Sequence, residues 1–119
     1  MAGILIHLTH GADRPTEADR AFLIAQTVLE GGHRLAMFLA GAAVDLMTTT
    51  RLDEPLGFGP RLGERFDQIV TGGGDVHVSR MSCELRGVPL GSLHEAVTPS
   101  PPAELVRLTL AYDRVITYG

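Results

Sequence analysis

Hydrophobic positions along the chain fall into short runs that alternate with stretches of helical period. Residues 4–9 (ILIHLT) are almost continuously apolar or β-branched, which is typical of a strand buried on both faces of a parallel sheet. Residues 17–30 instead repeat apolar side chains at helical spacing and end at Gly31–Gly32. A second apolar run follows at residues 33–39 (HRLAMFL). Strand, helix and strand in this order predict a right-handed βαβ unit.

The rest of the chain continues this alternation with shorter elements. In chain order, the pattern predicts a short helix over 42–47, a loop without clear period over 48–63, a helix over 64–71, a strand over 76–78, a polar, proline-rich break over 90–102, a helix over 103–111 and a strand over 114–118. The whole of residues 1–119 is therefore expected to form a single α/β domain. Its mostly parallel sheet, of about five strands, should carry helices on both faces.

Composition limits the partners and the location of the protein. The chain has 119 residues, enough for one domain, and its formal net charge of -4 lacks the basic excess of nucleic-acid-binding and membrane-surface proteins. No segment approaches the ~20 apolar residues of a membrane span. The single cysteine excludes an intramolecular disulfide framework, and the amino terminus lacks a basic n-region. We expect a soluble cytoplasmic protein that binds neither nucleic acid nor membrane.

Candidate chemistry concentrates in residues 75–88 (DVHVSRMSCELRGV). A short strand leads into Ser79, which has the side chain and the position of a helix N-cap. The helix that follows contains the only cysteine, Cys83, and closes at Arg86–Gly87. Parallel sheets place their ligands where the carboxyl end of a strand meets the amino end of a helix. This stretch is therefore the expected site.

Three segments resemble the DsrE/DsrF-like family of small sulfur-relay proteins. They are THGAD followed by a helix that ends in LEGGHRLAMFL, then LAGAAVDLM, and then VHVSRMSCELRGV with a late YDRVITY strand. The resemblance spans almost the whole chain and implies a flavodoxin-like three-layer sandwich. It also implies homo-oligomers, often trimers or hexamers, and in many members a cysteine that carries sulfur as a persulfide. The low charge of residues 35–47 agrees with an oligomer interface.

The chain departs from this family at the residue that matters most. The family's cysteine lies seven residues before the arginine of the Arg-Gly pair, and that position is Ser79 here. Some members carry a second cysteine three residues later, where this chain has Ser82. An alcohol does not form a persulfide, so the usual residue cannot carry sulfur. Cys83 matches neither position.

Cys83 admits two interpretations. One helical turn separates it from Ser79, so its thiol could replace the missing one as the catalytic group, with Arg80 or Arg86 lowering its pKa. In that case Ser79, His10, Arg80 and Arg86 would form the ligand-binding site around it. The other interpretation, which we favour slightly, is a small buried hydrophobic side chain.

Histidines supply a further alternative. If the strands at 4–9 and 76–78 were neighbours, His7 and His77 could approach each other and form a metal site with His10 and Cys83. No local ligand pair of the HExxH or CxxC kind supports this. His10 is the histidine we retain as a site residue, because it ends a strand at the ligand edge. Asp13, in the next turn, is interpreted as a helix cap in preference to a partner of His10.

Three functions thus remain open on the sequence alone. The first is a sulfur-relay protein that carries a persulfide on Cys83 and exchanges sulfur with a donor or acceptor protein. The second is a non-catalytic homo-oligomer that binds a small ligand or a partner protein. The third is a metal-binding protein that uses the histidines. The first two involve no cofactor.

Overall fold

A five-stranded parallel sheet forms the centre of the computed structural model, which describes residues 2–57 and 59–119. The strands are, in chain order, β1 (Gly3–Leu8), β2 (Arg34–Leu39), β3 (Asp75–Ser79), β4 (Val97–Ser100) and β5 (Arg114–Tyr118). Their order across the sheet is β4-β3-β2-β1-β5, and every pairing is parallel. The carboxyl ends of all five strands therefore lie at one edge of the sheet.

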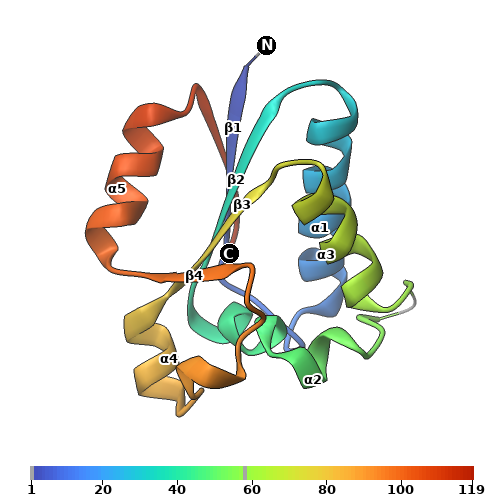
Figure 1. Cartoon of the computed structure of the whole chain (residues 1–119), viewed down its shortest axis with the longest axis vertical. Helices are drawn as coiled ribbons and strands as arrows, with labels where there is room; N and C mark the ends of the chain where they lie inside the picture. Colours follow the sequence, from blue (N-terminus) through green and yellow to red (C-terminus); the bar gives the residue numbers. More distant parts are fainter. Residues whose placement is uncertain (1, 58) are drawn as a thin grey trace.

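Helices cover both faces of the sheet and confirm the expected three-layer α/β sandwich (Figure 1). One face is covered by α1 (Pro15–Glu30) and α3 (Leu62–Thr71), and the other by α5 (Pro102–Ala111). The four shortest helices are η1 (Gly41–Met47), α2 (Thr49–Leu52), α4 (Arg80–Arg86) and η2 (Leu90–Ser92). The strand order differs from the 2-1-3-4-5 order of flavodoxin.

The two faces of the sheet have cores of unequal size. On the α1 and α3 side, a large core joins alternate residues of the strands, such as Ile6 and Met37, to Phe22 and Phe66 of the two helices. On the α5 side, the buried side chains of the smaller core are Leu5, Ala36, Phe38 and Leu108. The low-charge segment over 35–47 belongs largely to these cores: residues 35–39, 43, 44, 46 and 47 are buried. Its low charge therefore reflects burial within the chain and is no evidence for an oligomer interface.

Two elements differ from the sequence expectation. β4 lies inside the segment expected to be a proline-rich break, and Pro99 hid it because proline rarely occurs within a strand. Proline is tolerated there because β4 is an edge strand, with only β3 as a neighbour. Residues 48–57 and 59–63 were expected to lie in a loop without clear period, but they contain α2 and bury Leu52 and Leu56.

Among the residues that the structure describes, no helix is both long and apolar enough to cross a membrane.

The burial pattern predicts that leucines of this chain differ sharply in their contribution to stability. Leu39→Ala, in the central strand β2, removes a fully buried side chain and should lower the free energy of unfolding by about 2–5 kcal/mol. Leu85→Ala, at a side chain that is 82% exposed, should change it by less than about 0.5 kcal/mol. Chemical denaturation measures both, and similar losses for the two variants would contradict the described core.

Candidate functional site

Three turns meet at the carboxyl ends of the neighbouring strands β1, β2 and β3. In the first turn, a Cβ on Gly11 would lie 2.5 Å from the Ala42 carbonyl oxygen, so only glycine allows this close approach to the second turn. Gly41 in the second turn has a φ of 56°, a left-handed conformation that favours glycine. Its backbone N–H donates to Ser82 Oγ at 2.9 Å, which ties the second turn to the third. The predicted site is therefore one continuous surface of the fold.

Ser79 is the last residue of β3 and caps helix α4, as the sequence predicted. Its Oγ accepts a hydrogen bond from the Ser82 N–H at 3.1 Å. The other end of the helix closes at Gly87, which has a φ of 68°, while the Val88 N–H donates to the Cys83 carbonyl at 2.9 Å. Both ends of this seven-residue helix are thus fastened. The Ser79 hydroxyl therefore has a structural role.

The Cys83 sulfur lies inside the large core and not at the surface of the site. The residue is fully buried and is packed with the side chains that cover the α1 and α3 face of the sheet. Burial raises the pKa of the thiol, and the negative charges of Asp45 and Glu84 raise it further. The protonated thiol is therefore favoured at neutral pH. Arg80 and Arg86 were expected to lower the pKa of this thiol, but neither contributes to its shift.

Arg86 is held by an acidic side chain of η1. Its Nη2 lies 2.6 Å from Asp45 Oδ2, and its Nε donates to Asp45 Oδ1 at 3.2 Å. This paired hydrogen bond raises the pKa of Arg86, and the charge of Asp13 adds to the effect. Arg80 has only a long contact with Glu84, at 3.9 Å, and more than half of its side chain is exposed. Arg80 is therefore free to meet a ligand, whereas Arg86 already has its partner.

His10 lies just beyond the end of β1 and is oriented by Asp13. Its Nδ1 is 3.0 Å from Asp13 Oδ2, and the Gly11 N–H donates to Asp13 Oδ1 at 2.8 Å. The hydrogen bond from His10 is the main reason that the pKa of Asp13 is lowered, with the Gly11 N–H second. Asp13 does not cap helix α1, whose N-cap position is Arg14 and lacks a side-chain hydrogen bond. Asp13 is therefore a partner of His10, the role that the sequence analysis had favoured less than helix capping.

His7 and His77 are not neighbours, because β2 separates their strands. Phe38 lies between them, with its ring centroid 6.1 Å from that of His7 and 6.4 Å from that of His77. His77 is buried: its Nδ1 lies 2.8 Å from Ser100 Oγ, and its Nε2 lies 2.9 Å from Asp75 Oδ2 without the alignment of a hydrogen bond. Within residues 2–57 and 59–119, no three histidine, cysteine or acidic side chains are grouped as metal ligands would be.

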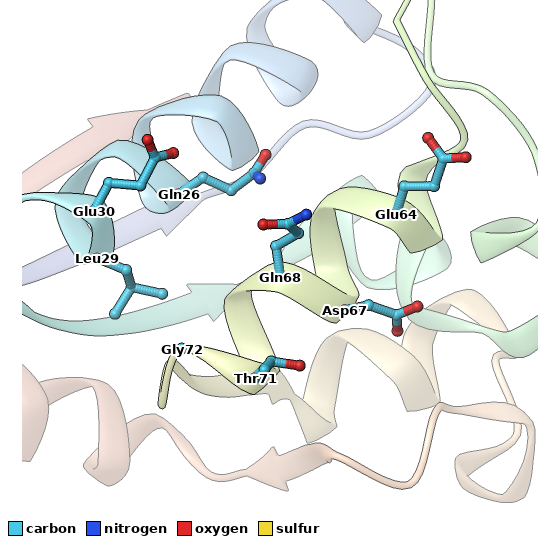
Figure 2. Close-up of a pocket in the computed structure, with 8 residues that line it drawn as sticks. All are labelled: Gln26, Leu29, Glu30, Glu64, Asp67, Gln68, Thr71 and Gly72. Carbon is cyan, nitrogen blue, oxygen red and sulfur yellow. The ribbon is translucent and has the colours of Figure 1, made fainter.

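Two hollows of the described structure lie away from this edge. A groove of about 640 Å³ runs between α1 and α3, where Gln26 and Gln68 point into the same space (Figure 2). A smaller hollow of about 360 Å³ lies beside the starts of β2 and β3 and includes Arg34 and Asp75. Neither hollow is lined by Cys83, Ser79, His10, Arg80 or Arg86.

Two contributors to the site were missed in the sequence, Gly41 and Asp45. Asp45 is the more informative, because its carboxylate both pairs with Arg86 and disfavours ionisation of Cys83. A single acid inside the otherwise apolar GAAVDLM segment was the available signal. Chemically, the described edge offers hydroxyls, an oriented imidazole and a free guanidinium. Those groups can bind a polar ligand, but they include no exposed thiol.

Comparison with known proteins identifies relatives of the whole chain. The model of the DsrE/DsrF-like family matches residues 2–118. A search of curated proteins gives no match.

Solved structures of low sequence identity share the fold. The ychN protein of E. coli has a TM-score of 0.86 at 20% identity, over 99% of this chain and 100% of that one. MTH1491 of Methanobacterium thermoautotrophicum, a protein of unknown function, has a TM-score of 0.75 at 11% identity, over 98% and 99% of the two chains. BT1422 of Bacteroides thetaiotaomicron, also of unknown function, has a TM-score of 0.69 at 14% identity, over 96% and 93%.

The capping role of Ser79 predicts which substitutions the position tolerates. Ser79→Ala leaves the Ser82 N–H without its acceptor and should lower the free energy of unfolding by about 0.5–2 kcal/mol. Ser79→Asp keeps an oxygen acceptor and should stay within about 0.5 kcal/mol of the original chain. Denaturant unfolding compares the two variants. Equal losses for both would mean that the hydroxyl does not act as a cap.

The Asp13–His10 contact predicts a pH-dependent contribution to stability. The pKa of Asp13 is lower in the folded state than its ordinary value of 3.8, so the contact stabilises the fold fully above that value. The contribution should disappear as the pH falls through the folded-state pKa. Asp13→Asn should therefore be less stable than the original chain at pH 6, and the difference should shrink below pH 3.8. Thermal unfolding over this range measures it; a constant difference would contradict the assignment.

Proposed function

Because the chain belongs to the DsrE/DsrF-like family, we propose that it is a non-catalytic member, a homo-oligomeric module that binds a small ligand or a partner protein at the carboxyl edge of its sheet. The observation that carries this proposal is the burial of Cys83 together with a serine at the family's cysteine position. The family as a whole is one of sulfur relay, so a partner from sulfur transfer is the natural expectation. A cytoplasmic location agrees with the single, unpaired cysteine.

The chemistry of sulfur transfer favours a non-catalytic binding module over a protein that carries a persulfide on Cys83. A persulfide forms when a thiolate attacks the outer sulfur of a donor persulfide, which leaves the donor as its own thiolate. The attacking group must be ionised and within reach of the donor. Burial and the charges of Asp45 and Glu84 oppose ionisation of Cys83, and the core covers its sulfur. Both conditions are unmet in the folded chain.

We propose that His10 and Arg80 contact the ligand, with the Ser79 and Ser82 hydroxyls beside them. Arg80 is exposed and only weakly paired, and His10 is held in place by Asp13. Arg86 acts as a positioning residue, because its guanidinium fastens α4 to η1 through Asp45. A guanidinium and an imidazole at one edge favour an anionic group on the ligand or partner.

A second candidate, in which Cys83 carries sulfur after all, requires that α4 open transiently to expose the thiol. The helix has only seven residues, and Met81 and Leu85 on its outer side are exposed. Short elements with few buried contacts open at lower cost than the whole domain does. The metal-binding alternative has less support, since Phe38 separates the two histidines on which it depended.

Incubation with a low-molecular-weight persulfide donor tests the proposal directly. The native chain should gain no sulfur atom by intact mass, because Cys83 is buried and the pKa of its thiol is raised. Ser79→Cys in a Cys83→Ala background restores the family's cysteine position and should gain one sulfur atom. Ser92→Cys in the same background is the matched control for an ordinary surface thiol, and it should react at least about tenfold more slowly.

The outcomes separate the candidate functions. A mass gain on the native chain that Cys83→Ala abolishes would replace the proposal with persulfide carriage by Cys83. An inert Ser79→Cys variant would mean that the edge has lost sulfur chemistry altogether, which leaves binding as its function.

A further inference from the structure

β5 presents an open edge of the sheet. It pairs with β1 on one side, and no other described strand pairs with its second side. Arg114, Val115 and Thr117 are exposed, and Val115 is a large apolar side chain at 42% exposure. An edge strand exposes a row of unpaired backbone donors and acceptors, which is a template for another strand. Such an edge is usually protected unless it has a partner.

The pairing with β1 shows which backbone groups of β5 face outward. The Tyr118 carbonyl accepts from the Thr9 N–H at 2.9 Å, so Tyr118 directs its backbone groups toward β1. Because N–H and C=O groups of successive strand residues alternate in direction, Ile116 and Arg114 also face β1. Val115 and Thr117 therefore direct their N–H and C=O groups away from the domain. These two residues form the free edge.

The opposite edge of the same sheet is protected. β4 contains Pro99, whose ring nitrogen cannot donate a hydrogen bond. β5 has neither proline nor lysine, and its only charged residue is Arg114 at its first position. Proline and charge are the usual means by which an edge strand avoids pairing with another chain. The sequence thus blocks one edge and leaves the other competent to pair.

We propose that β5 pairs with β5 of a second copy of this chain, antiparallel and about a twofold axis at Ile116. In this register Val115 lies opposite Thr117 of the second copy, and the same pair recurs across the axis. The outward N–H and C=O groups of both residues then form about four hydrogen bonds. The two sheets continue into one another across the interface.

The side chains of β5 are complementary to themselves in this register. Ile116 meets Ile116, and Val115 meets the methyl-bearing Thr117, so the contact is apolar and β-branched. Arg114 lies opposite Tyr118 and not opposite a second arginine, so like charges do not face each other. A one-residue shift of the register would place an outward-facing residue of one strand opposite a residue whose N–H and C=O groups face β1 of its own subunit. The hydrogen bonds between the two strands could then not form. Self-complementarity therefore identifies a second copy as the occupant.

This inference rests on the homo-oligomeric part of the proposed function and defines its symmetry. A twofold interface uses the same surface on both subunits. It builds dimers, and it can join two trimers into a hexamer, but an isolated threefold trimer has no such axis. The even-numbered assemblies among those expected for the family are therefore the ones that this edge can form.

Amide hydrogen exchange of the native protein, resolved by residue, tests the pairing. Without a partner, the Val115 and Thr117 amides are unpaired and should exchange rapidly. In the paired assembly both should exchange at least about tenfold more slowly, and dilution below the dissociation constant should remove this protection. The Ile116 and Tyr118 amides, which face β1, should stay protected at both concentrations and serve as the internal control.

A backbone substitution provides the second test. Thr117→Pro removes an outward donor that the single domain does not use, so circular dichroism should report an intact fold. Sedimentation should show that the twofold contact is weakened at least about tenfold. Thr117→Ala is the matched control: it removes the side chain but keeps the N–H, and should weaken the contact less than about threefold.

Each outcome decides a different claim. An oligomer whose Val115 and Thr117 amides exchange rapidly would overturn the β5 interface and leave the proposed homo-oligomer intact. A native protein that sediments as a monomer at micromolar concentration would overturn both, while the sulfur assay still judges the site at the carboxyl edge. Protected amides together with a weakened Thr117→Pro variant would establish the interface.

Discussion

The uninterrupted parallel pairing of five strands is the constraint on which the rest of this structure depends. Each inner strand must have both of its edges paired and both of its faces covered, since unpaired buried backbone groups are costly. This requirement puts β1, β2 and β3 in the middle of the sheet and sends their connections over its faces. All carboxyl ends then fall at one edge, where three turns are close enough for Gly41 to donate to Ser82. The candidate site is a consequence of the pairing direction.

At that edge, one acidic residue organises the electrostatics. Asp45 holds Arg86 through two hydrogen bonds and at the same time adds negative charge near Cys83. The arrangement stabilises the short helix α4 but works against an ionised thiol. Ser79 caps this helix, at the position where the sequence resemblance implied a cysteine.

The two faces of the sheet differ in the size of their apolar cores, and its two edges differ in their ability to pair with another strand. The α1 and α3 face has a large apolar core, whereas α5 covers the other face with a small one. The β4 edge is blocked by Pro99, and the β5 edge is open. A domain of this size can leave one edge open without unfolding, because its stability comes from the large core. The open edge is then free to serve in association.

The sequence by itself determined the elements whose signal is local. The apolar runs of β1 and β2, the helical period of α1, the cap at Ser79 and the turn at Gly87 each depend on neighbouring residues, so they could be predicted. The family resemblance was likewise carried by contiguous motifs, and the resemblance together with the spacing to Arg86 implied the departure at Ser79. Only the tertiary structure decided the features that join distant segments. It placed Phe38 between His7 and His77, paired Asp45 with Arg86 across 41 residues, and enclosed Cys83 in the core. Strand order and side-chain burial result from packing of the whole chain, and a periodic pattern specifies which face of an element is apolar but not which element will cover it.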